Sequence, residues 1–153
     1  MSIQFEVQRE VRVPKERLYA ALLDLEAAEH WMQGLVRMER QDTGPMQEGS
    51  SWIETRKMYG REASEHFEVV ELKAPEKIRL RVDGTKGASD KGEYRFTYTV
   101  EESGDASTVT LNGEIRGLTG LTKLFVRMMV STFGKACAKD LDSLKEHLES
   151  KQD

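Results

Sequence analysis

The chain has 153 residues, a formal net charge of −4 and a sequence pI near 5.5. This length is sufficient for one domain with its own core, and we expect a single domain over 1–150 followed by a frayed tail over 151–153. The acidic balance argues against a general nucleic-acid binder. There is no long apolar run and no secretory signal pattern at the start, so we expect no stable membrane insertion and a cytoplasmic location.

The beginning of the chain predicts one strand and two short helices. Apolar and polar residues alternate over 3–13, which is typical of a strand with one buried face. Arg9 interrupts the apolar set, and the pattern leaves open whether its side chain reaches the interior. Pro14 ends the strand and suits the first turn of a helix. The apolar spacing over 18–25 predicts that helix, and 26–31 predicts one or two further turns.

Six further strands are predicted, separated by short segments rich in turn-forming residues. The first begins at Val36 and ends before 42–45, and the others span 50–58, 61–72, 77–82, 93–100 and 108–116. The short connections indicate consecutive antiparallel hairpins.

The closing segment from Leu118 to Leu148 predicts one long helix of about 45 Å. Its apolar residues recur at spacings of three and four: Leu118, Leu121, Leu124/Phe125, Met128/Met129, Phe133, Ala136/Cys137, Leu141, Leu144 and Leu148. Val126 and Val130 lie off this stripe and suggest a self-association patch, and so a homodimer. Cys137, the only cysteine, is interpreted as a buried apolar residue rather than a nucleophile.

A sheet that buries one face, followed by a single long helix, predicts an α+β, helix-grip fold. In this fold a curved seven-stranded antiparallel sheet wraps around the C-terminal helix. Such an arrangement leaves space between sheet and helix, and we expect a functional site there.

Hairpin geometry predicts which strand residues face this space. A turn at 59–60 pairs Trp52 with Phe67 and Glu54 with Glu65, and paired residues share a face of the sheet. The more apolar face then holds Trp52, Met58, Ala63, Phe67 and Val69. We also expect the following pairs and triples: Val69 with Ile78; Phe67 with Leu80; Val82, Leu80 and Ile78 beside Tyr94, Phe96 and Tyr98; and these beside Ile115, Gly113 and Leu111. Val70 and Leu72 point outward in this register unless a bulge intervenes.

The same register places Glu54, Arg56 and Glu65 on the inward face among aromatic side chains. Burying an ion costs several kcal/mol, roughly, so these groups must pair with one another or face a solvated cavity. Arg9 could join them. Two interpretations remain open: a structural ion-pair cluster at the rim of the sheet, or a group of charges facing a ligand.

The expected ligand-binding surface combines sheet and helix residues: Trp31, Trp52, Glu54, Arg56, Phe67, Leu80, Tyr94, Phe96, Tyr98, Phe125, Met128, Met129 and Phe133. The aromatic ladder and the methionines also fit an ordinary core, in which methionine fills irregular gaps. The three histidines lie on different elements without ligand spacing, and no phosphate-binding loop is present. We therefore expect neither a metal nor a cofactor.

The order strand, two short helices, six strands and long helix, with Val13-Pro14-Lys15-Glu16-Arg17-Leu18-Tyr19 opening the helix pair, resembles the START/Bet v 1-like (SRPBCC) superfamily. The chain is most similar to its polyketide cyclase/dehydrase-like branch. The segment Gly49-Ser50-Ser51-Trp52-Ile53-Glu54-Thr55-Arg56, followed by Gly60-Arg61-Glu62-Ala63, carries the resemblance through its Trp-x-Glu-x-Arg hairpin. The resemblance implies a deep cavity for a hydrophobic or amphipathic molecule. No catalytic motif of the cyclases matches this chain, so activity does not transfer with the fold.

Three functions are compatible with the sequence. The first is binding or carriage of a hydrophobic small molecule, such as a lipid or an aromatic metabolite. The second is cyclisation or dehydration of a polyketide-like substrate, with Glu54 or Glu65 as base and Arg56 holding an enolate or carboxylate. The third is a protein-interaction module similar to chaperone activators. The interior discriminates among them: a filled interior favours the module, a dry apolar pocket the carrier, and a wet pocket with carboxylates the enzyme.

Overall fold

The computed structural model describes residues 3–58, 60–83 and 92–150. Of the loop that the sequence predicts over 84–92, residues 84–91 lie outside the described residues, as do the turn residue Tyr59 and the tail expected over 151–153. The elements in chain order are β1 (Ile3–Val11), α1 (Lys15–Leu23), the 3₁₀ helix η1 (Ala28–His30), β2 (Leu35–Arg40), β3 (Ser51–Met58), β4 (Arg61–Lys73), β5 (Lys77–Asp83), β6 (Glu93–Ser103), β7 (Ala106–Arg116) and α2 (Gly120–Ser150).

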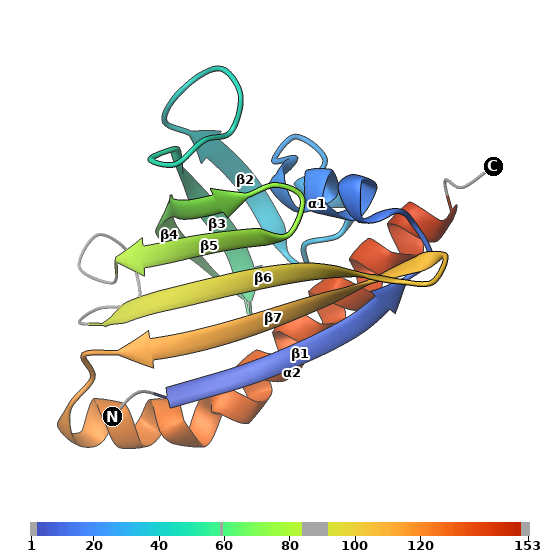
Figure 1. Cartoon of the computed structure of the whole chain (residues 1–153). Coiled ribbons are helices and arrows are strands. Elements are labelled where there is room, and N and C mark those ends of the chain that lie inside the picture. The colour runs from blue at the N-terminus through green and yellow to red at the C-terminus, as the bar shows by residue number, and fades with distance from the viewer. Residues whose placement is uncertain (1–2, 59, 84–91, 151–153) are drawn as a thin grey trace.

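The strands form one antiparallel sheet in the order β1-β7-β6-β5-β4-β3-β2. The sheet curves, and the long helix α2 runs across its concave side, next to β1 (Figure 1). α1 follows Pro14 and buries Leu18, Tyr19 and Leu22. The helix-grip architecture predicted from the sequence is therefore confirmed.

The strand register agrees with the prediction except between β4 and β5. Trp52 pairs with Phe67 and Glu54 with Glu65, as expected. The other pairs expected across the sheet are also present, since Leu80 pairs with Phe96, which in turn pairs with Gly113.

The predicted pairing of Val69 with Ile78 and of Phe67 with Leu80 is wrong. Val69 pairs with Leu80, and Phe67 pairs with Val82. A bulge between Val69 and Glu71 inserts one extra residue, which returns Leu72 to the core face and leaves Val70 exposed. The predicted pairing is displaced by two residues along β5. Because side chains alternate between the two faces of a strand, a displacement of two residues leaves the assignment of the inward face unchanged.

The first half of α2 faces differently from the prediction. Leu141, Leu144 and Leu148 are buried, as expected, but Val126 and Val130 face the sheet and pack against the cluster of Ile3, Ile115 and Leu118. The predicted self-association patch is therefore wrong.

The residues assigned to the inner stripe of this half, Leu121, Leu124, Phe125 and Met128, are exposed instead. The predicted stripe went back from Leu141 in steps of four. Each such step turns about 40° beyond a full helical turn, so five steps reach the opposite side of the helix.

Phe5 on β1 sets the spacing between helix and sheet. Its ring lies over Gly113 of β7, where a Cβ atom would overlap it, and 3.6 Å from the position that a Cβ atom would take on Gly134 of α2. The ring also packs edge-on against Phe133, with centroids 5.3 Å apart. Two glycines thus make room for one aromatic wedge between the two layers.

The wedge predicts opposite effects for two Gly→Ala substitutions. Gly113→Ala is expected to destabilise the fold by about 1 to 3 kcal/mol, because the new methyl group overpacks against Phe5. Gly134→Ala is the matched control, since its methyl group would meet Phe5 at an ordinary distance and alanine favours a helix by about 1 kcal/mol. Urea unfolding of the two variants measures the difference, and equal stability would contradict the proposed role of Phe5.

Candidate functional site

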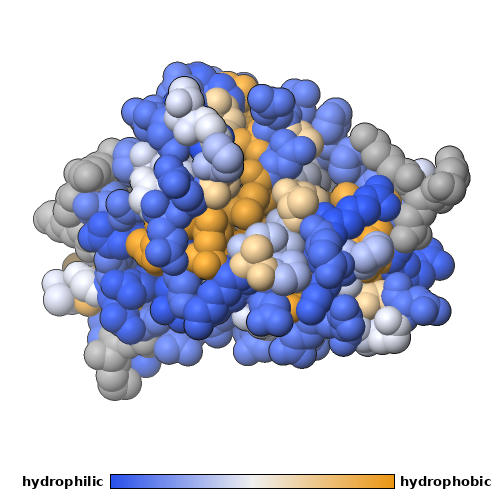
Figure 2. All heavy atoms as spheres, turned by 45° about the horizontal axis from the view of Figure 1, so that its top comes forward, coloured by the Kyte–Doolittle hydropathy of each residue, from blue (hydrophilic) through white to orange (hydrophobic). Residues whose placement is uncertain are grey.

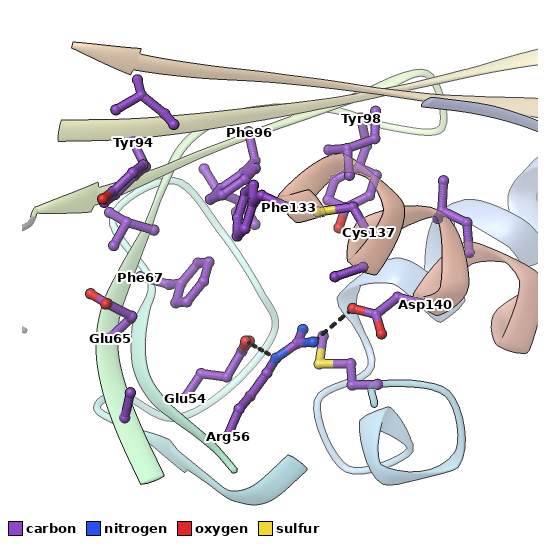
Figure 3. A pocket seen from close by; sticks show the side chains of 18 of the residues that line it. Glu54, Arg56, Glu65, Phe67, Tyr94, Phe96, Tyr98, Phe133, Cys137 and Asp140 are labelled. Atoms are coloured by element: carbon purple, nitrogen blue, oxygen red, sulfur yellow. Dashed lines mark hydrogen bonds and ion pairs between the residues drawn. The ribbon is translucent and has the colours of Figure 1, made fainter. Parts of the chain in front are cut away.

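A cavity of about 390 Å³ lies between the concave side of the sheet and α2. Figure 3 shows it lined by aromatic rings from β4, β6 and α2, with charged groups on one side. On the face of the molecule drawn in Figure 2, a band of apolar atoms is set between hydrophilic residues.

Most of the residues expected to face a ligand line this cavity. They are Trp31, Trp52, Glu54, Arg56, Phe67, Leu80, Tyr94, Phe96, Tyr98, Met129 and Phe133, together with Glu65, the second candidate base. Phe125 and Met128 do not line it, because they lie on the outward face of α2. The lining also contains residues that were not predicted as site residues, among them Val126, Val130, Ala136, Cys137 and Asp140.

The polar side of the cavity is a three-residue cluster centred on Arg56. Arg56 and Glu54 stand two residues apart on β3, so both side chains leave the same face of the strand. Arg56 Nε donates to Glu54 Oε2 at 2.7 Å, and Nη1 donates to Asp140 Oδ2 of α2, also at 2.7 Å. Both carboxylates are buried. The cluster therefore joins the sheet to the helix across the cavity.

Asp140 is the member that the sequence analysis missed. Its other oxygen, Oδ1, accepts a hydrogen bond from the backbone N–H of Gln33 at 2.9 Å. The loop that carries Gln33 lies against β3, where Lys57 N–H donates to the Gly34 carbonyl at 2.7 Å. Gly34 has a φ of 72° and leaves no room for a Cβ atom beside the Lys57 carbonyl, so glycine is required there.

Arg9, considered as a further member, lies elsewhere. Its Nε donates to Asp142 Oδ1 at 2.7 Å, in a pair open to solvent. The helix pattern could have identified Asp140 instead, because a carboxylate four residues before the buried Leu144 falls on the inward side.

The cluster keeps Arg56 charged. Burial acts to lower the pKa of its guanidinium, but the neighbouring Glu54 and Asp140 outweigh this effect and raise the pKa above its usual value. Two carboxylates and one guanidinium leave a formal charge of −1. The cluster is therefore formally anionic, and it lies beside an apolar cavity.

Tyr98 and Cys137 complete this side of the cavity (Figure 3). Burial, reinforced by the nearby carboxylates, raises the pKa of the Tyr98 hydroxyl well above its usual value. Burial also raises the pKa of the Cys137 thiol to about 12, again with Asp140 contributing. Both groups are neutral near pH 7, so Cys137 is unsuited to nucleophilic attack and Tyr98 remains a hydrogen-bond donor.

A hydrogen-bond donor remains available to a bound molecule. The indole nitrogens of Trp31 and Trp52 are buried and make no hydrogen bond within the described part of the chain, but they have almost no surface open to the cavity. The third guanidinium nitrogen of Arg56, Nη2, takes no part in the two ion pairs and points into the cavity (Figure 3).

Among the described residues, no three His, Cys, Asp or Glu side chains are placed to hold a metal ion. Two of the three histidines do meet, since the rings of His30 on η1 and His147 on α2 stack with centroids 5.0 Å apart. Over the same residues, no helix is long and apolar enough to cross a membrane.

The buried ion pair is expected to contribute much more stability than an exposed one of the same length. Asp140→Asn keeps the shape of the side chain but leaves Arg56 with one carboxylate, and it should cost about 3 kcal/mol. Asp142→Asn removes the equally short pair with Arg9 at the surface, and it should cost less than about 1 kcal/mol. Comparable losses on chemical denaturation would show that the cluster does not hold α2 to the sheet.

The raised thiol pKa predicts slow alkylation of the folded protein. With a pKa of about 12 in place of the ordinary 9.0, the thiolate fraction of Cys137 at neutral pH falls about a thousandfold. Reaction with iodoacetamide, followed by mass spectrometry, should therefore be slow in buffer and fast in denaturant. Equal rates in the two conditions would place Cys137 outside the buried lining.

Comparisons with known proteins agree with this architecture. Residues 2–149 match the family described as polyketide cyclase / dehydrase and lipid transport. A search of curated proteins found no match. Among solved structures, TTHA0849 from Thermus thermophilus has 17% identity and a TM-score of 0.78, covering 97% of this chain and 99% of that one.

Two further solved structures share the fold at low identity. Major latex-like protein 151 from Panax ginseng has 11% identity and a TM-score of 0.79, over 96% of this chain and 97% of that one. A START superfamily protein from Mycobacterium smegmatis has 14% identity and a TM-score of 0.76, over 95% and 98%. The chain thus belongs to the polyketide cyclase / dehydrase and lipid transport family, and it shares its fold with a START superfamily protein.

Proposed function

We propose that this protein binds or carries a hydrophobic or amphipathic small molecule, a lipid or an aromatic metabolite, in the cavity between the sheet and α2. The observation that carries the proposal is an interior left open at about 390 Å³ and lined mainly by aromatic and aliphatic side chains. Protein interiors normally pack to the density of organic crystals, so an apolar space of this size suits a ligand. We place this activity in the cytoplasm and in the single domain over 1–150.

The lining supports a particular ligand chemistry. The ring of Phe67 stacks between the indole of Trp52, at a centroid distance of 5.6 Å, and the ring of Phe96, at 6.2 Å. The three rings offer flat apolar surface. The donor that remains is Nη2 of Arg56, which suits an oxygen acceptor. Because the cluster already has a formal charge of −1, a neutral acceptor such as a carbonyl suits it better than a second carboxylate.

The two tryptophans of the chain both line the cavity, so intrinsic fluorescence reports its occupancy. Titration with apolar ketones, sterols or fatty acids is expected to change this emission saturably. Mass spectrometry of an organic extract of the purified protein would identify a retained ligand. An extract free of apolar molecules, together with no saturable response to any of these ligands, would refute the proposal.

Filling the cavity should abolish binding without unfolding the protein. Ala136 lines the cavity from α2, and Ala136→Phe is expected to reduce affinity at least tenfold, because the ring occupies space needed by the ligand. Ala20→Phe, at an exposed position of α1, is the matched control and should bind like wild type. Equal binding by the two variants would place the ligand outside the cavity.

A second candidate is an enzyme that cyclises or dehydrates a polyketide-like substrate. It is favoured by the placement of Arg56 between a carboxylate and the open cavity, with Glu65 opposite Glu54 on the neighbouring strand. A carboxylate would take a proton next to a carbonyl, and Arg56 would hold the resulting enolate oxygen. Arg56→Ala should then abolish turnover; because it leaves Glu54 and Asp140 without their partner, circular dichroism first checks that the variant is folded. Unchanged turnover in folded Arg56→Ala and in Glu54→Gln would exclude this scheme.

The third function considered, an interaction module similar to chaperone activators, would be favoured by a filled interior. The open cavity therefore supports the carrier and the enzyme over the module.

A further inference from the structure

The first half of α2 presents large apolar side chains to solvent. Leu121, Leu124, Phe125 and Met128 are 84%, 55%, 63% and 72% exposed. Their spacing of three, four and seven residues places them on one side of the helix, and we call them the α2 apolar face. In Figure 1 the first turns of α2 extend beyond β1 and β7 at the lower edge of the molecule. Water-exposed apolar clusters of this kind mark surfaces of interaction.

The segment of α2 that carries this face has a positive net charge, although the chain as a whole is acidic. From Gly120 to Lys139, α2 carries Lys123, Arg127, Lys135 and Lys139 and no acidic residue. Lys135 and Lys139 follow Met128 by seven and eleven residues, so they lie within about 20° of its direction around the helix. The α2 apolar face therefore continues along the helix into a basic segment on the same side.

The α2 apolar face is also continuous with the cavity. Met129 and Phe133 line the cavity, yet they are 42% and 38% exposed. Met129 stands next to the apolar face, since it follows Met128 and lies one turn from Phe125. Phe133 lies one further turn along the helix from Met129. Apolar surface therefore extends around the helix from the solvent side to the cavity lining.

We propose that the α2 apolar face docks on an anionic lipid surface. Leucine, phenylalanine and methionine would enter the interfacial layer, and the lysines would lie over the lipid head groups. This pose brings Met129 and Phe133, and with them one side of the cavity, to the bilayer. Exchange of an apolar ligand at that point rests on the proposed function, whereas docking itself does not.

A lipid surface fits better than a second copy of this chain. The face is a convex ridge of one helix, which a bilayer can accept without a complementary groove. Pairing two copies through it would bring Lys135 and Lys139 of each helix into one interface, with no acidic residue between Gly120 and Lys139 to neutralise them.

Co-sedimentation with vesicles tests the proposal. Wild type should bind vesicles of equal parts phosphatidylglycerol and phosphatidylcholine, should not bind phosphatidylcholine alone, and should be released by salt. Lys135→Gln with Lys139→Gln should weaken binding about fivefold per lysine. Leu121→Ser with Phe125→Ser should weaken it at least tenfold, because the apolar groups no longer enter the interface.

Val36→Ser with Val70→Ser is the control, since it also removes two exposed apolar side chains, but from β2 and β4. It should bind vesicles like wild type. No binding by wild type, or equal binding by all variants, would overturn the proposal. So would a wild-type dimer in sedimentation velocity that Leu121→Ser with Phe125→Ser converts to monomer. None of these residues lines the cavity, so tryptophan fluorescence titrations of the same variants assess the proposed function separately.

Discussion

The ion pair between Arg56 and Asp140 is the interaction on which the rest of the site depends. It joins β3 to α2 at one side of the cavity, with 2.7 Å between Arg56 Nη1 and Asp140 Oδ2, and holds the helix at a fixed distance from the strand. At β1 and β7 the Phe5 ring, accommodated by Gly113, keeps the same helix away from the sheet. The helix is thus held by a polar link on one side and an aromatic wedge on the other. With both in place the layers cannot collapse onto each other, and the space between them stays open.

The polar link is costly, and its cost indicates what the cavity is built to do. Two buried carboxylates and a guanidinium lose much of their hydration, and apolar residues of similar volume would often give equal or greater stability. A cluster used only to attach the helix would need no donor directed elsewhere. Arg56 instead directs Nη2 into the cavity. The same charges therefore hold the helix and leave a donor available to a ligand.

The faces of the strands could be predicted, because they follow from the alternation of neighbouring residues. The orientation of the first half of α2 could not, because it depends on small rotations that add up along the helix. Trp52, Glu54 and Arg56 were placed inward because a period of two residues is insensitive to small errors of register. No glycine marks the bulge after Val69 in the sequence. The only indication of a bulge was that Val70 and Leu72 would otherwise both point outward. The first half of α2 was misassigned because a small angular error grows along a helix. Asp140 was missed for a different reason: it lies in the correctly oriented half, but a pattern of apolar residues does not single out a carboxylate among them.

The two halves of α2 differ in how firmly they are held. The C-terminal half buries Leu141, Leu144 and Leu148 and contributes Asp140 to the ion pair. The N-terminal half contacts the sheet through Val126, Val130 and Phe133 and leaves its other large apolar residues, Leu121, Leu124, Phe125 and Met128, in water. Segments with few buried apolar contacts open at the lowest free energy. The N-terminal half is therefore where the cavity would open most readily, and it is the half whose outer surface suits a lipid interface. A molecule leaving the cavity there would pass from one apolar surface to another without crossing water.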